Sequence, residues 1–147
     1  MKMDEKIRSA IVERVSMEGY AVKMGLKLIE LSSGVAVVEM VPRKDDENIF
    51  GMVHGGAIFS LIDEAFQASC NSHGRVAVAL NINVMFHAPP AFNQTLRAES
   101  REHHRSTKTA TYHITVTDET GKLIASCQAL AYRKRESLPF LREKSDA

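Results

Sequence analysis

One stretch constrains the fold of this chain more than any other: residues 54–72, HGGAIFSLIDEAFQASCNS. At 100° per residue, apolar side chains cover most of its circumference, which predicts a largely buried central helix. The polar residues share one narrow stripe: Ser60, Asp63, Glu64, Gln67 and Asn71. The simplest interpretation is an amphipathic helix with a narrow wet face. Because the stripe carries two adjacent carboxylates, we favour a stripe that faces a cavity or a partner chain.

The segments around this helix predict strands that follow one another in series. A first helix is expected over residues 4–15 with Asp4 as its cap, followed by a linking segment over residues 19–25. Strand patterns occupy residues 26–42, as two strands around a Ser-Ser-Gly turn, and residues 76–87, 94–104, 108–118 and 122–134. The charged tail, residues 136–147, is expected to fray.

This order of elements predicts an α+β fold, in which a curved antiparallel sheet wraps one long central helix. The 147 residues fit a single domain, 1–147, with room for a core. A net charge of +1 encodes no strong attraction to nucleic acid or to an anionic membrane. No signal peptide and no apolar stretch of about 20 residues is recognisable, so we expect a cytoplasmic protein. Cys70 and Cys127 lie in apolar segments and are interpreted as reduced core residues.

The strand pattern over residues 76–87 is the clearest in the chain. It alternates with period two over twelve residues, so Val78, Leu80 and Ile82 are expected on one face. Asn81 and Asn83 are expected on the other, more polar face.

Partial desolvation would raise the basicity of Asp63, and a neighbouring cavity would give it a group to deprotonate. Glu64 is longer and could reach solvent. The glycines after His54 have a matching use: the first N–H groups of a helix lack internal partners, and glycine lets a substrate oxygen approach them. The alternative is that Gly55 and Gly56 only permit a tight turn before the helix.

Helix geometry adds a condition to such a site. Gly55 and Asp63 are eight residues apart, about 12 Å along one helix, so one carbonyl cannot touch both in the same chain. A site that uses both needs two chains with antiparallel helices. A two-fold homodimer provides this and contains two equivalent sites.

The segment HGGAIFSLIDEAF resembles the HGG-x-x-F-S-L-x-D-x-A-F segment of hotdog-fold acyl-CoA thioesterases, with closest similarity to the phenylacetic-acid-degradation type within the 4-hydroxybenzoyl-CoA thioesterase superfamily. Asn48 and Gly51 also match the related pattern N-x-x-G-x-x-HGG. The resemblance implies a hotdog fold, an acyl-CoA substrate, and a homodimer or homotetramer. It implies no metal and no cofactor other than the coenzyme A of the substrate.

The resemblance also implies roles for individual residues. Asp63 would be the general base for a water, or a nucleophile that forms a mixed anhydride. The Gly55 N–H would polarise the thioester carbonyl, while His54 and Asn48 would orient the loop, the water or the thioester.

Further positions follow from the same resemblance. Some relatives carry a Ser on the central strand beside the water, and Asn81 or Asn83 would substitute for it here. The expected substrate contacts are Gly56, Asn81, Asn83 and Phe86, and the expected coenzyme A contacts are Arg105, Ser106, Lys108 and Thr109. The alternative for the two Asn is pairing with neighbouring side chains, and for Arg105 and Lys108 it is ordinary solvated charge.

Two other functions remain open at this point. A hydratase or dehydratase acting on enoyl or 3-hydroxyacyl thioesters would use His54 as its main base. A non-catalytic acyl-CoA-binding module would tolerate loss of Asp63. The acyl group itself is left open between aryl-acetyl, benzoyl-like and medium-chain types.

Overall fold

The computed structural model describes residues 2–141 of the chain. Its elements, in chain order, are α1 (Glu5–Met17), α2 (Gly19–Met24), β1 (Lys27–Ser32), β2 (Val35–Met40), the 3₁₀ turn η1 (Lys44–Asp46), α3 (Gly55–Asn71), β3 (Arg75–Phe86), β4 (Leu96–Arg105), β5 (Thr109–Thr117), β6 (Leu123–Ser137) and the 3₁₀ turn η2 (Pro139–Leu141). Both predicted helices and all six predicted strands are present. No helix within the described range is long and apolar enough to cross a bilayer.

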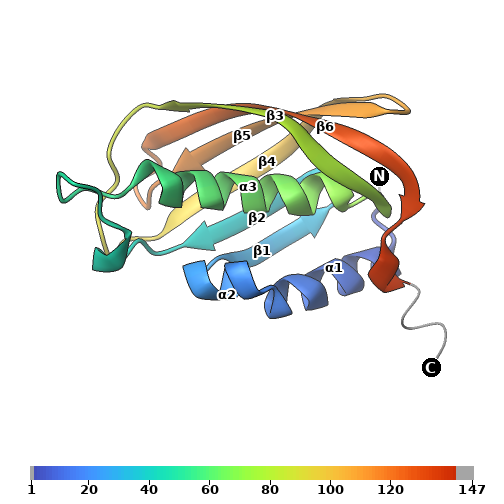
Figure 1. The fold of residues 1–147 in the computed structure, drawn as a ribbon, viewed down its shortest axis with the longest axis horizontal. Coiled ribbons are helices and arrows are strands. Elements are labelled where there is room, and N and C mark those ends of the chain that lie inside the picture. Colours follow the sequence, from blue (N-terminus) through green and yellow to red (C-terminus); the bar gives the residue numbers. More distant parts are fainter. Residues whose placement is uncertain (1, 142–147) are drawn as a thin grey trace.

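The six strands form one antiparallel sheet in the order β1-β2-β4-β5-β6-β3. The sheet curves around α3, which packs against its inner face (Figure 1). Leu61, Ile62 and Phe66 of α3 are almost fully buried. The Phe66 ring meets Tyr112 of β5 edge-on, with 5.4 Å between the ring centroids. The predicted α+β architecture, a long helix wrapped by a curved antiparallel sheet, is therefore confirmed.

The helices α1 and α2 lie along the side of α3 that the sheet leaves open (Figure 1). Asp4 caps α1 as predicted, because its Oδ1 accepts a hydrogen bond of 2.8 Å from the Lys6 N–H. The predicted linking segment is instead the helix α2, which ends at Gly25 in the left-handed conformation (φ 70°). Six residues make fewer than two turns, so no helical period shows in the sequence.

β3 departs from the predicted alternation at a bulge between Ala79 and Asn81. Before the bulge Ala77 is buried, whereas after it Ile82 and Val84 pack against the core and Leu80 is left 58% exposed. The prediction of one unbroken apolar face was wrong, because a bulge inserts one residue and reverses which side chains point inward. β3 is also an edge strand of the sheet.

The C-terminal segment belongs to the fold as far as Leu141. Leu138 is only 3% exposed and its N–H donates to the Gly74 carbonyl over 3.0 Å. The tail that was expected to fray from residue 136 is thus structured over its first residues. Residues 142–147, the rest of that prediction, lie outside the described residues.

Both cysteines are free and buried, in agreement with their interpretation as core residues. Burial raises the pKa of the Cys70 thiol to about 12 and that of Cys127 to about 11. Both are therefore protonated at neutral pH and unsuited to act as nucleophiles.

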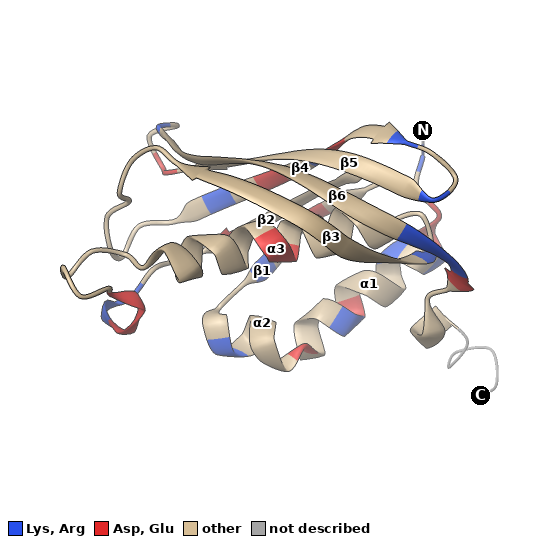
Figure 2. Cartoon of the chain, turned by 45° about the horizontal axis from the view of Figure 1, so that its top comes forward, with Lys and Arg blue, Asp and Glu red and all other residues tan. Residues whose placement is uncertain are grey.

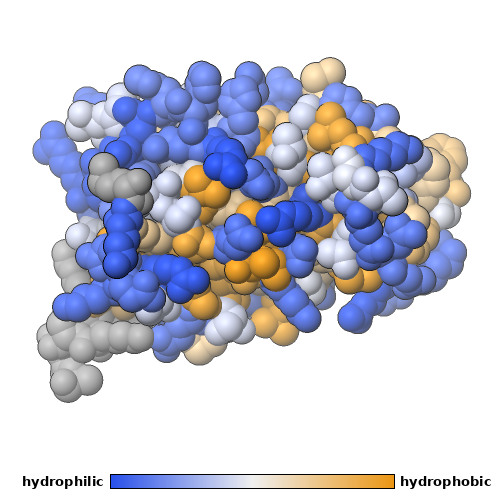
Figure 3. Space-filling view, turned by 180° about the vertical axis from the view of Figure 1, so that it is seen from behind, coloured by the Kyte–Doolittle hydropathy of each residue, from blue (hydrophilic) through white to orange (hydrophobic). Residues whose placement is uncertain are grey.

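The molecular face behind the view of Figure 1 is mostly hydrophilic, with narrower apolar areas near its middle (Figure 3).

Candidate active site

The start of α3 is built around His54, its N-cap residue. The His54 Nδ1 accepts a hydrogen bond of 2.7 Å from the Gly56 N–H, and the His54 N–H donates to the Asp46 carbonyl over 2.7 Å. A Cβ on Gly56 would lie 2.9 Å from that Nδ1. Glycine at this position therefore makes room for the capping imidazole, and its N–H is already occupied.

Gly55 is the first residue of α3 and lies against Phe86, at the end of β3. A Cβ on Gly55 would come within 3.4 Å of the Phe86 ring. Within residues 2–141, the Gly55 N–H has no hydrogen-bond acceptor. An unpaired N–H at this end of a helix carries part of the positive end of the helix dipole, which suits a carbonyl oxygen that gains negative charge.

Asn48 organises the loop before α3. Its Oδ1 accepts hydrogen bonds from the N–H groups of Phe50 (2.9 Å) and Met52 (3.0 Å), and its own N–H donates to the Met52 carbonyl (2.7 Å). The structure thus gives Asn48 the loop-orienting part of its expected role.

The two carboxylates of α3 have opposite surroundings. Asp63 is exposed in the isolated chain, whereas Glu64 is only 4% exposed. Glu64 is long enough to reach solvent but does not, because α1 and α2 pack over its side of the helix. Gln67 Nε2 donates to Glu64 Oε1 and to Glu18 Oε2, each over 2.8 Å.

These surroundings raise the pKa of both groups. Burial, and then the hydrogen bond and charge of Glu18 and the charge of Asp63, raise the pKa of Glu64 to about 8. Burial, and then the charge of Glu18, also raise the pKa of Asp63. At neutral pH Glu64 is thus mostly protonated, while Asp63, whose pKa is raised as well, stands on the open side of the helix.

The polar stripe of α3 is accordingly divided in two. The Ser60 hydroxyl is hydrogen-bonded to the Tyr20 hydroxyl of α2 (2.6 Å) and donates to the Gly56 carbonyl (2.9 Å), so it is covered together with Glu64. Of the other half, Asp63 and Gln67 are exposed in the single chain, while Asn71 is half-buried. In Figure 2 the acidic residues in the middle of α3 lie between β3 and the pair α1–α2.

Gly55 and Asp63 lie on one unbroken helix, which confirms their axial separation of about 12 Å. The structure brings Gly55, Gly56, His54 and Phe86 together at the start of α3. It leaves Asp63 two turns away on the same helix.

Asn81 and Asn83 do not lie beside Asp63 of the same chain. In the register of the sheet Asn83 is opposite Gln128 of β6, which in turn is opposite His113 of β5. These exposed residues alternate with the buried ones that face α3, so Asn81 and Asn83 point to the outer face of the sheet.

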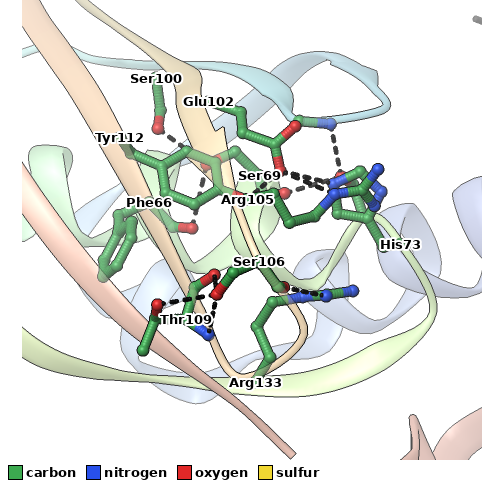
Figure 4. A network of polar contacts seen from close by, with 12 residues as sticks. Phe66, Ser69, His73, Ser100, Glu102, Arg105, Ser106, Thr109, Tyr112 and Arg133 are labelled. Atoms are coloured by element: carbon green, nitrogen blue, oxygen red, sulfur yellow. Dashed lines mark hydrogen bonds and ion pairs between the residues drawn. The ribbon is translucent and has the colours of Figure 1, made fainter.

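The expected coenzyme A segment is the hairpin between β4 and β5. The Ser106 hydroxyl is hydrogen-bonded to the Thr109 hydroxyl (3.0 Å) and accepts from the Thr109 N–H (3.2 Å), which closes the turn (Figure 4). Arg105 Nε pairs with Glu102 over 3.4 Å, while Lys108 is exposed.

Two further basic residues, which sequence reasoning missed, join this hairpin. Arg133 of β6 donates to the Ser106 carbonyl (2.7 Å), and Arg75 of β3 donates to the Thr107 carbonyl (3.3 Å). Burial, and then the charges of Arg75 and Arg105, lower the pKa of the Arg133 guanidinium. A crowded cluster of cations from three separate strands suits a phosphate group. Only their order in the sheet, which the sequence does not show, could have revealed it.

Comparison with known proteins assigns the chain to a family. Residues 50–125 match the Thioesterase superfamily. This chain belongs to that superfamily. It is a hotdog-fold thioester hydrolase, and the matched region includes Gly55, Asp63 and Phe86.

Individual relatives agree with this assignment. The chain is 33% identical over 110 residues to the acyl-coenzyme A thioesterase PaaI of Escherichia coli, covering 75% of this chain and 79% of that protein. The solved structure of E. coli PaaI, from the phenylacetic acid degradation operon, superposes with a TM-score of 0.87, covering 92% of this chain and 98% of that one at 28% identity. A protein of Archaeoglobus fulgidus named as an esterase is 36% identical over 139 residues, which are 90% of this chain and 89% of that protein.

Proposed function

We propose that this thioesterase hydrolyses acyl-CoA at two equivalent sites of a homodimer, each built from Asp63 of one subunit and the Gly55 N–H of the other. The observation that carries the proposal is the placement of these two groups about 12 Å apart on one helix, both accessible in the single chain. The kinship with E. coli PaaI supports an acyl-CoA substrate. The cytoplasmic location and the tetrameric state remain predictions.

The edge strand β3 supports the dimer. Among the described residues it pairs with β6 on one side only, and Leu80 (58%), Met85 (62%) and Phe86 (54%) are exposed. A long apolar edge is a ready template for another strand. Pairing two β3 strands about a two-fold axis makes the sheets continuous and sets the two α3 helices antiparallel.

In the proposed reaction, the thioester carbonyl accepts a hydrogen bond from the Gly55 N–H. Asp63 removes a proton from a water, whose oxygen attacks the carbonyl carbon. The tetrahedral intermediate then breaks its C–S bond, and the thiolate leaves with the proton from Asp63, giving the acid and free coenzyme A. Direct attack by Asp63, with a mixed anhydride that water hydrolyses, needs the same carboxylate. Neither route needs a metal or a further cofactor.

The remaining parts of the site have supporting roles. His54 caps the helix that presents Gly55, and Asn48 shapes the preceding loop. The cluster of Arg75, Arg105 and Arg133 would hold the phosphates of coenzyme A. Asn81 and Asn83, on the outer face of the sheet, have no part in this proposal. The engagement of His54 Nδ1 by the Gly56 N–H disfavours a hydratase that uses this histidine as its base.

Free-thiol release from a panel of aryl- and alkyl-CoA thioesters tests the chemistry. Asp63→Asn and Asp63→Ala should lower kcat by roughly 10²–10⁴, the range for a general base. Asp45→Asn, at an exposed carboxylate in η1, is the matched control. Full activity of Asp63→Asn would refute the assigned role.

Subunit complementation tests the shared site. Gly55→Pro removes the N–H at the first helical position, where proline is well tolerated, while Gly55→Ala keeps the N–H and adds the same contact with Phe86. Mixing inactive Gly55→Pro and Asp63→Asn subunits should restore up to about a quarter of the activity, because half of the dimers are mixed and each has one intact site. A site within one chain would show no restoration.

A further inference from the structure

The loop before α3 exposes apolar side chains although hydrogen bonds fix its shape. Ile49 is 93% exposed, Phe50 76% and Met52 44%. The Asn48 side chain holds the N–H groups of Phe50 and Met52, as described above. The loop projects beyond the N-terminal end of α3 (Figure 1). Large apolar side chains displayed on a shaped loop mark a contact surface.

A groove between α1, α3 and η2 offers an apolar surface of the matching kind. Its volume is about 710 Å³. Most of the residues that line it are apolar, among them Ile11, Val15, Met17, Ala68, Val76 and Phe140, and the charged Arg14 and Glu18 line it as well. Gln67 and Asn71 of α3 form its rim, and Gln67 lies one helical turn, about 6 Å, beyond Asp63 on the same stripe. The groove therefore starts beside the proposed catalytic carboxylate and continues away from it.

The antiparallel helix pair determines what faces this groove. When Gly55 of one α3 lies opposite Asp63 of the other, a step toward the N-terminus on one helix matches a step toward the C-terminus on its partner. The loop ahead of Gly55 then falls opposite the turns that follow Asp63, where Gln67 and Asn71 lie. The two-fold axis repeats this arrangement at the other end of the dimer.

We propose that Ile49 and Phe50 of each protomer pack in the groove of a second copy of this chain and form the end wall of its acyl site. This inference rests on the proposed function, because the shared site fixes the register of the two helices. An acyl chain that passes Asp63 enters the groove beside Gln67, and the loop from the other copy limits how far it extends. Phe50 is then a specificity-determining residue.

Disulfide trapping tests the contact directly. The loop that carries Phe50 projects beyond the N-terminal end of α3, and Gln67 lies about 18 Å along that helix from Gly55. Phe50 and Gln67 of one chain are therefore farther apart than the roughly 7 Å between Cα atoms that a disulfide permits. Any bond in the double variant Phe50→Cys/Gln67→Cys must therefore join two chains. Oxidation should convert most of the protein into a covalent dimer on a denaturing gel. Phe50→Cys/Met17→Cys provides a second pair on the opposite wall of the groove.

The controls are the single variant Phe50→Cys and the double variant Phe50→Cys/Ser32→Cys, whose second site is at the far edge of the sheet. Both should stay monomeric on the denaturing gel. A chain that ends at Leu141 tests whether residues 142–147 occupy the groove instead. If the covalent dimer forms only in this shortened chain, the groove of the full chain is not open to the loop of a second copy, and the proposal is overturned.

A kinetic measurement gives an independent result. Phe50→Ala should weaken the dimer by about 10- to 100-fold in Kd, as loss of a central aromatic anchor does, and should shift the preference in kcat/KM toward longer acyl chains. Tyr132→Ala, at an exposed aromatic on the outer face of the sheet, should change neither. If complementation between Gly55→Pro and Asp63→Asn succeeds but neither cysteine pair is trapped and Phe50→Ala keeps the wild-type preference, the loop contact is refuted while the shared site stands.

Discussion

The buried carboxyl of Glu64 should make the stability of this protein depend on pH. The folded state raises its pKa from 4.5 to about 8, so the folded chain binds the proton more tightly than the unfolded chain. The stabilisation is complete below about pH 4.5 and is lost as the pH rises through about 8. Each pH unit between the two pKa values changes the free energy of unfolding by about 1.4 kcal/mol. About three such units lie between pH 5 and the folded pKa of about 8, so the loss of stability from pH 5 to pH 9 is at most about 4 kcal/mol. Because an ionised carboxylate draws in water, we expect about 2–4 kcal/mol.

The variant Glu64→Gln should remove most of this dependence, since its amide oxygen can still accept from Gln67. Its free energy of unfolding at pH 9 should exceed that of the wild type by about 2 kcal/mol or more, with a difference within about 1 kcal/mol at pH 5. The free energy of unfolding of this variant should still fall with rising pH, but less steeply, because the pKa of Asp63 is also raised.

The assay is urea unfolding at fixed protein concentration, since association would otherwise shift the midpoint. It is followed by circular dichroism because the chain has no Trp. Glu136→Gln, at an exposed position of β6, is the matched control and should follow the wild type. If the free energies of unfolding of wild type and Glu64→Gln change in parallel from pH 5 to 9, the assigned burial of the charge is refuted.

Three further outcomes are expected. Leu138→Ala should lower the free energy of unfolding by about 2–4 kcal/mol in urea, because it empties a buried site under α1, and a loss below about 0.5 kcal/mol would contradict that packing. Gly74→Ala should cost at least about 1 kcal/mol in the same assay, since φ is 86° and the new Cβ would lie 2.7 Å from Ile7 Cδ1; an unchanged midpoint would be inconsistent with this. Arg105→Ala should raise KM for an acyl-CoA by roughly 3- to 10-fold with little change in kcat, and should not affect an acyl-pantetheine that lacks the nucleotide phosphates; equal effects on both substrates would place the phosphates elsewhere.

The sequence was most informative where one periodic pattern sufficed. The apolar circumference of residues 54–72 predicted the central helix, and the serial strand patterns predicted the sheet around it. The separation of Gly55 and Asp63 followed from helix geometry alone. These features depend on local spacing, which a single sequence records directly.

Features that depend on packing between distant segments could not be predicted. Which carboxylate is buried was decided by Glu18 and Tyr20, some 40 residues or more before their partners on α3. The bulge beside Leu80 reverses which side chains of β3 point toward the core, and the regular alternation of apolar and polar residues in this strand does not predict it. The reason for Gly56 was missed as well, because the clash that it avoids is with the His54 imidazole as a helix cap.

The order of strands has a consequence for how the protein is made. Within residues 2–141, β3 pairs only with β6, the last strand of that range, although β3 ends at Phe86 and β6 begins at Leu123. A nascent chain therefore carries this apolar strand with both edges open until the final strand has been synthesised. The subunit pairing that we propose through β3 therefore has to wait until β6 has been synthesised, and during that interval the chain is most exposed to aggregation.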